Sequence, residues 1–368
     1  MIPPDEGDPL RSAEGPGGLD DTPAAPVVPA APDTPAASAD VPSLPAEAPA
    51  RPGASTFTIE GRSAPALFVV GWLASVIGLG AVAIALLSGG QPAAPILLIG
   101  GLVVLALGLV AAAGSQAIER RARGVSGYRG PSPFLVFGAT VPISLLAGAL
   151  IGIPLQLLDL PLDGPLARLG SVAAQALVYV ALIRLLVVDV GALSWAEMGV
   201  RRPDARALAE LGAGALWAGP VILLTIPVAA ILSQVVPVTP VSPLPPSGET
   251  TGFIINLIAG AVVAPLGEEL LFRGFATTAW ARTMGPRRAL VRAALFFAFV
   301  HVLTISGTSA GEALGLALVG FASRIPVALA LGWLFLRRQS IWAPIGLHAT
   351  FNGVLIVLAE IAARSGLV

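Results

Sequence analysis

The chain contains no cysteine, which excludes disulfide bonds and thiolate chemistry. Lysine is also missing, and all 21 basic residues are arginines. Charged residues make up only 12% of the 368 residues, and the formal net charge is −1. A nearly neutral chain has no basic field that would attract nucleic acid, so we expect no nucleic-acid partner. Only two histidines are present, His301 and His348, which confines imidazole chemistry to two places.

Apolar residues, in contrast, make up 55% of the chain, and its mean hydropathy is +0.84. Runs of about 20 apolar residues recur, which is the length that crosses a bilayer as a helix with its backbone hydrogen bonds satisfied. The runs show no in-out alternation, which argues against a transmembrane barrel. We therefore expect an all-α polytopic membrane protein with about nine transmembrane helices, near 65–88, 92–113, 133–155, 169–188, 211–233, 253–284, 288–305, 312–336 and 341–361. In the first of these, Gly71 and Gly78 share one face and predict close contact with another helix.

Residues 1–63 differ from the rest, since they hold 13 of the 34 prolines and ten acidic residues against three arginines. Such a segment cannot bury enough apolar surface to offset its ordering entropy. We expect a disordered, acidic, Pro/Ala-rich tail at 1–63, followed by N-terminal transmembrane helices at 64–249 and a C-terminal helical core at 250–361.

Arginines gather in alternate connections between the expected helices, for example at Arg120, Arg121 and Arg123, at Arg201 and Arg202, and at Arg337 and Arg338. Because cytoplasmic connections of membrane proteins carry the excess of basic residues, this pattern predicts a cytoplasmic N-terminus. The exclusive use of arginine, with abundant alanine, glycine and proline, is typical of a GC-rich bacterial genome. We therefore expect an integral protein of a bacterial cell membrane.

Three polar motifs interrupt the apolar C-terminal third: Glu268-Glu269-Leu-Leu-Phe-Arg273, Phe297-Ala-Phe-Val-His301 and His348-Ala-Thr-Phe-Asn352. Ionisable groups within a membrane segment cost about 2.5–3.5 kcal/mol each on insertion scales, so they are functional candidates. Glu269 and Arg273 are four residues apart and are expected to form an ion pair on one helix face. Glu268 is rotated by about 100° from Glu269, so the two carboxylates can have different tasks. Phe297 is expected to pack under His301.

Helix geometry predicts that these motifs meet. If the helix that carries Glu268 continues to Met284, Glu268 and His301 both lie roughly 22–26 Å from the intervening turn. His348 and Asn352 share one face of the last helix. A carboxylate beside an imidazole can deprotonate water and later protonate a leaving amine. A second imidazole and an amide can donate hydrogen bonds to an oxyanion, so the cluster favours peptide hydrolysis.

The three motifs, in this order, resemble the CPBP family, which comprises CAAX prenyl endopeptidases and the bacteriocin-processing (Abi) proteases. The family pattern is Glu-Glu-x-x-x-Arg, then Phe-x-x-x-His, then His-x-x-x-Asn or Asp, and the resemblance covers about residues 250–355. It implies an intramembrane endopeptidase that acts on a peptide or membrane-protein substrate. It also implies site roles: Glu268 and His301 activate water, His348 and Asn352 form an oxyanion hole, and Glu269 and Arg273 support the site.

Several alternatives stay open at this point. The resemblance favours a metal-free glutamate mechanism without a cofactor, but a metalloprotease with zinc bound by Glu268, His301 and His348 is the alternative, because imidazole and carboxylate groups suit zinc. A non-catalytic scaffold or bacteriocin-immunity-type protein could bind a peptide in the same cavity, and a proton-coupled transporter could use the same groups as a relay. Arg324 also interrupts an apolar run, and we expect it to pair with a carboxylate or to line the cavity.

Overall fold

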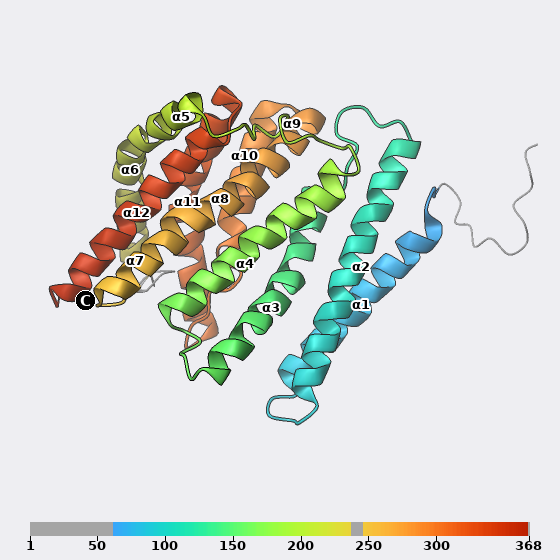
Figure 1. Cartoon of the computed structure of the whole chain (residues 1–368), viewed down its shortest axis with the longest axis horizontal. Helices are drawn as coiled ribbons and strands as arrows, with labels where there is room; N and C mark the ends of the chain where they lie inside the picture. The colour runs from blue at the N-terminus through green and yellow to red at the C-terminus, as the bar shows by residue number, and fades with distance from the viewer. Residues whose placement is uncertain (1–61, 237–245, 367–368) are drawn as a thin grey trace, which may run out of the picture. The chain divides into compact units, whose positions relative to one another are not determined.

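The computed structural model describes residues 62–236 and 246–366. The predicted tail lies outside these residues except for its last two positions. Within the described ranges the secondary structure is helical, without strands (Figure 1). The α-helices are α1 (Pro65–Leu87), α2 (Ala94–Ala122), α3 (Pro133–Leu157), α4 (Pro165–Ile183), α5 (Ala205–Leu216), α6 (Ala218–Val235), α7 (Thr250–Ile258), α8 (Ala264–Glu268), α9 (Thr278–Met284), α10 (Pro286–Val300), α11 (Ala310–Arg338) and α12 (Trp342–Arg364). Three π-helical segments, η1 (Arg184–Val188), η2 (Ala259–Val263) and η3 (Glu269–Thr277), continue these helices without a break.

Joined in this way, the described elements form eight helices that are long and apolar enough to cross a membrane, and one shorter helix, α10. The predicted helical membrane fold is therefore confirmed, with α10 as the exception to full length. We expected a span at 288–305, but α10 is a helix of 15 residues that ends at Val300. The segment after it, Thr304-Ile-Ser-Gly-Thr-Ser309, is rich in residues that disfavour helix interiors. Ser309 instead caps the start of α11, where its hydroxyl accepts a hydrogen bond from the Glu312 backbone amide.

Small residues allow α1 and α2 to pack closely, as the sequence predicted for Gly71 and Gly78. A Cβ at Gly71 would lie 2.6 Å from the backbone nitrogen of Ala112, and one at Gly78 would collide with the backbone of Leu105. Glycine is therefore required at both positions for the helix backbones to approach one another.

Glycines also allow close packing of α12, the helix that carries His348, against α5. A Cβ at Gly346 would collide with the carbonyl of Leu211 in α5, and one at Gly214 of α5 would collide with the carbonyl of Ala343. The backbones of α5 and α12 are thus in direct contact at these two glycines, which lie about one helical turn apart from each other along the contact. This contact leaves α12 little freedom to shift along α5, and it sets the height at which His348 enters the bundle.

The arginine-rich connections meet at one end of the helices, the upper end in Figure 1. There the Glu197 carboxylate lies 2.7 Å from the Arg282 guanidinium, which ties the connection between α4 and α5 to α9. The Trp342 indole donates a hydrogen bond of 3.2 Å to the carbonyl of Arg201, which ties the same connection to the start of α12. This gathering of basic residues is what the positive-inside pattern requires, and the side of the membrane remains a prediction.

Outward-facing side chains along the helices are mostly apolar and exposed, as in Leu87 at 87%, Leu157 at 80% and Leu216 at 81% exposure. Exposed leucine on this scale is unfavourable in water but is the ordinary surface of a protein in lipid. Buried aromatic residues lie on the inside, with Phe272, Phe275 and Phe297 at most 2% exposed. The apolar interior and the apolar exterior together leave the polar motifs of the C-terminal helices as a distinct internal cluster.

Candidate active site

The two adjacent glutamates lie where the long helix from Thr250 to Met284 changes its winding. Glu268 is the last residue of α8 and Glu269 is the first of η3. All nine residues of η3 are buried, and the Thr277 hydroxyl donates a hydrogen bond of 2.7 Å to the carbonyl of Phe272, five residues earlier. Single π-helical turns are found frequently at functional sites, because they change the direction of the side chains on a helix. Despite this change the helix continues to Met284, as the depth argument for Glu268 and His301 required.

Glu269 is held from two sides and has no exposed surface. Its Oε1 atom lies 2.9 Å from Nη1 of Arg273 and 2.7 Å from Nδ1 of His348. With Arg273 as its cationic partner the carboxylate acts as an acceptor, so the proton of this contact belongs to Nδ1 of His348. The structure thus contains the predicted ion pair between Glu269 and Arg273. It also shows that Glu269 fixes the imidazole of His348, with Nε2 turned to the other glutamate.

Glu268 lies between the two imidazoles. Its Oε2 atom is 3.4 Å from Nε2 of His301 and 3.8 Å from Nε2 of His348. Nδ1 of His301 lies 2.7 Å from the carbonyl oxygen of Phe297, which can only accept, so this nitrogen carries a hydrogen. Among the described residues Oε2 of Glu268 has no hydrogen-bond partner, although it is buried. Both imidazoles therefore present Nε2 to a carboxylate oxygen that no other group engages.

Accessibility divides the cluster into a closed and an open part. The side chains of Glu269, Arg273 and His348 are at most 6% exposed. The side chain of Glu268 is 18% exposed and that of His301 is 26% exposed. Glu268 and His301 are therefore the members that an incoming molecule can reach. His301 lies at the C-terminal end of α10 and not within a helix, because α10 ends one residue earlier.

The ring of Phe297 connects the parts of this cluster. Its centroid lies 4.3 Å from that of His301 and 5.8 Å from that of His348. The guanidinium of Arg273 lies over the same ring at 4.2 Å, within the range of a cation–π contact. Phe297 packs against His301, as the sequence predicted, and it also orders His348 and Arg273.

Asn352 has a different partner from the one that the resemblance implies. Its Nδ2 atom donates a hydrogen bond of 2.9 Å to the carbonyl of Gly260 in η2. Within the described part of the chain it makes no hydrogen bond to either glutamate or either histidine. An amide nitrogen carries two hydrogens, so one remains for another acceptor. The structure thus brings five of the six predicted site residues into direct contact and leaves Asn352 on the neighbouring face of η2.

Two further polar residues of the membrane helices come from outside the three motifs, Tyr179 and Arg324. Tyr179 of α4 is 5% exposed and approaches the helix at Gly267, beside Glu268. Sequence reasoning missed it, because α4 lies outside the three motifs; its one signal was rarity, since the chain has only two tyrosines. Arg324 lies at the middle of α11, and its Nη1 donates a hydrogen bond of 2.8 Å to the carbonyl of Gly320. No ion pair joins Arg324 to a carboxylate within the described residues, so the expected pairing stays a prediction.

No group of three or more histidine, aspartate and glutamate side chains in the described residues is arranged to hold a metal ion. The carboxylate of Glu268 and the imidazoles of His301 and His348 are donor types that suit zinc, but these three side chains do not form such a group. Two cavities of the described structure lie elsewhere, at the arginine-rich end of the bundle, and do not include these residues.

Comparison with known proteins found a match for one part of the chain. Residues 250–354 match the family model described as "Type II CAAX prenyl endopeptidase Rce1-like". No curated protein and no solved structure matches the chain. The matched region begins at α7 and contains all three motifs, so the resemblance seen in the sequence is confirmed there. Residues 250–354 are therefore similar to an Rce1-like domain, and the eight helices able to cross a bilayer make the chain an integral membrane protein.

Proposed function

We propose that the chain hydrolyses a peptide bond within the membrane, with Glu268 as the base that activates water. The observation that supports this most directly is the division between the two glutamates. Glu269 is closed in by Arg273 and His348, whereas Oε2 of Glu268 faces two imidazole nitrogens and has no hydrogen-bond partner in the described structure. A carboxylate oxygen without a hydrogen-bond partner in the protein is free to accept a proton from water.

In the proposed reaction, one water molecule donates one hydrogen to Glu268 and the other to Nε2 of His301. Its lone pair then points at the scissile carbonyl carbon. Two hydrogen bonds of ordinary length from one water require acceptors about 4.4 Å apart, so the pair, now 3.4 Å apart, must open by roughly 1 Å when substrate enters. Glu268 takes the proton as the oxygen–carbon bond forms, and it returns the proton to the amine as the carbon–nitrogen bond breaks.

The carbonyl oxygen becomes an oxyanion in this step and needs hydrogen-bond donors. We assign this role to Nε2 of His348 and to the second amide hydrogen of Asn352. Because Nδ1 of His348 already donates to Glu269, donation from Nε2 requires the imidazolium form. Glu269 and Arg273 act by positioning this ring. No step of the reaction passes through a metal ion or another cofactor.

The substrate is a peptide segment that reaches the open side of the cluster from the bilayer. The location that we propose is a bacterial cell membrane with the arginine-rich end of the helices in the cytoplasm, since this end collects the basic connections. The tail at 1–63 would then lie on the cytoplasmic side.

The test uses the full chain purified in a neutral detergent, with an internally quenched peptide library as substrate. We expect cleavage by the wild type, cleavage by the control Glu249→Gln, whose side chain is exposed, and loss of about 10²–10⁴-fold in rate for Glu268→Gln. Cleavage should persist after treatment with a chelator. Loss of cleavage on chelation and its return with zinc would replace the metal-free mechanism, and binding of peptide by the wild type without cleavage would support the scaffold.

A further inference from the structure

A second site lies away from the glutamates, at the arginine-rich end of the bundle. There a cavity of about 250 Å³ opens between α6 and α11, two helices that pack against each other. Its lining consists of two tryptophans, one leucine and two arginines: Trp217, Trp333, Leu334, Arg337 and Arg338. A cavity of this size is close to the lower limit of ordinary ligand sites, so it can admit a small polar group with part of a longer molecule.

The charge of this lining is positive. Arg337 and Arg338 are exposed, and no acidic residue belongs to the lining. Arg338 lies 3.5 Å from Glu210, a loose ion pair, whereas Arg337 has no carboxylate partner among the described residues. The guanidinium of Arg337 lies 5.4 Å from the ring centroid of Trp333. Two adjacent guanidinium groups, one of them without an anion, are the usual recognition chemistry for a phosphate group.

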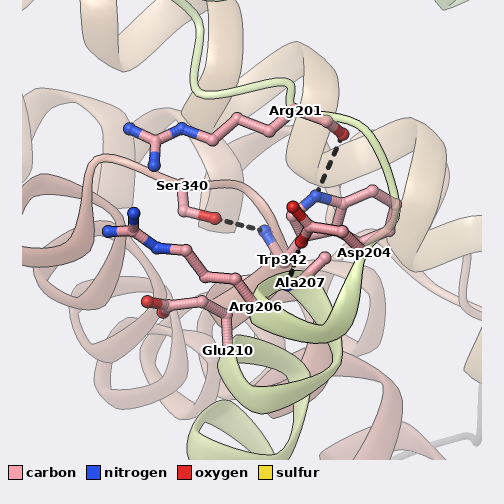
Figure 2. A pocket seen from close by; sticks show the side chains of 7 residues that line it. All are labelled: Arg201, Asp204, Arg206, Ala207, Glu210, Ser340 and Trp342. Carbon is pink, nitrogen blue, oxygen red and sulfur yellow. Dashed lines mark hydrogen bonds between the residues drawn. The ribbon is translucent and has the colours of Figure 1, made fainter.

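The neighbouring cavity, in contrast, does not suit a phosphate group. Figure 2 shows the guanidinium groups of Arg201 and Arg206 on one side of it with the Glu210 carboxylate, and the Asp204 carboxylate on the other side beside Trp342. Its volume is about 20 Å³, which is enough for a water molecule but not for a phosphate. Two acids line this cavity together with its two arginines, whereas the lining of the cavity between α6 and α11 holds two arginines and no acid.

The aromatic residues point to a lipid and not to a free anion. Trp217, the residue directly before α6, and Trp333 of α11 meet edge to face with centroids 5.1 Å apart. Tryptophans of membrane proteins collect at the level of the lipid headgroups. Trp333 is only five residues from the end of α11, which places the pair near the end of the bundle. Leu224, two helical turns further along the Trp217 face of α6, is 58% exposed and continues the surface as an apolar one.

From these contacts the geometry points to a binding site for an anionic phospholipid, with its phosphate at Arg337 and Arg338 and its acyl chains along α6. Basic pockets between membrane helices are known to hold such headgroups. The site is independent of the reaction proposed for Glu268, and it would exist in a chain without proteolytic activity.

The experiment is a lipid titration of the purified full chain in a neutral detergent, followed by native mass spectrometry. The probes are phosphatidylglycerol, phosphatidylcholine with the same acyl chains, and inorganic phosphate. We expect phosphatidylglycerol to bind more tightly than phosphatidylcholine. Arg337→Gln should weaken the binding of phosphatidylglycerol about fivefold, the effect of one basic side chain near an anionic headgroup, whereas Arg337→Lys should retain most of it.

The matched control is the double variant Arg287→Gln/Arg288→Gln, which removes two exposed arginines at the start of α10, at the same end of the bundle. It should bind phosphatidylglycerol like the wild type. The proposal is overturned if the control loses as much binding as Arg337→Gln, since the lipid would then be attracted by all the arginines at this end of the bundle and not by one site. Equal binding of the two lipids would overturn it as well, and so would displacement of the lipid by inorganic phosphate.

Discussion

Replacement of Glu269 by glutamine should lower stability far more than replacement of the adjacent Glu268, although both variants should lose activity. Glu269→Gln removes the carboxylate that compensates Arg273, whose side chain is 1% exposed. The other acceptor of the Arg273 guanidinium within the described residues is the carbonyl of Ala328 at 3.4 Å, which is a weak contact. A buried charge without its partner costs about 3–5 kcal/mol.

Glu268→Gln breaks no comparable contact. Oε2 of Glu268 has no hydrogen-bond partner among the described residues, and the nearest ring nitrogen, Nε2 of His301, is 3.4 Å away. The new amide can donate to Nε2 of His301, whose Nδ1 already carries a hydrogen. We expect a change in stability within about 1 kcal/mol, of either sign.

The assay is thermal unfolding of both variants in one detergent, together with peptide cleavage. Glu269→Gln should unfold at a temperature lower by on the order of 10 °C, and Glu268→Gln should unfold close to the wild type. Adding Arg273→Met to Glu269→Gln removes the orphaned charge and should recover much of the stability, but not the activity, because His348 stays unanchored. The reasoning is refuted if Glu268→Gln is the less stable single variant, or if the added Arg273→Met lowers stability further.

Three further predictions concern other parts of the chain. Tyr179→Phe removes only the hydroxyl of a buried side chain whose ring approaches the helix at Gly267, beside Glu268. It should leave the unfolding temperature within a few degrees while it lowers kcat, and an unchanged kcat would show that the Tyr179 hydroxyl has no part in the reaction. Gly346→Val should force α12 away from α5, cost about 1–3 kcal/mol in stability and reduce cleavage, whereas Gly353→Ala on the same helix, with its nearest neighbour at 3.6 Å, should be tolerated. Hydrogen bonding from Arg282, and then from Ser194, lowers the pKa of Glu197 from 4.5 to about 2. The ionised carboxylate therefore stabilises the fold by at most about 1 kcal/mol above pH 4.5, and this contribution is lost as the pH falls through 2. The difference in unfolding temperature between wild type and Glu197→Gln should be constant near neutral pH and should disappear in strong acid.

The fold could be predicted because membrane solvent imposes a simple rule: apolar runs of sufficient length become helices. The rule failed at α10, where Phe296 to Val300 continue an apolar pattern that ends abruptly at His301. Hydropathy alone does not show that the following serines and threonines end the helix there. The glycine pair Gly71 and Gly78 was informative, since spacing of small residues reports directly on how closely two helices can approach.

Within the site, four-residue spacing correctly placed Arg273 beside Glu269, because this contact lies on one helix. Spacing could not indicate which glutamate His348 would contact, since that depends on the winding of η3 and on the contact between α12 and α5. It also placed Asn352 on the same face as His348 without showing that Gly260 would accept its hydrogen bond. Contacts between helices far apart in sequence are set by packing, and packing is not encoded in any one motif.

The most direct test of the proposed mechanism is a single turnover in water enriched in oxygen-18, with the enzyme in excess over a peptide that it cleaves. If Glu268 acts as a base, water itself attacks the carbonyl, and the new carboxyl group of the N-terminal fragment carries one oxygen-18 atom after the first turnover. A first-turnover fragment without the heavy isotope would show that an enzyme oxygen attacked instead, and it would contradict the role proposed for Glu268.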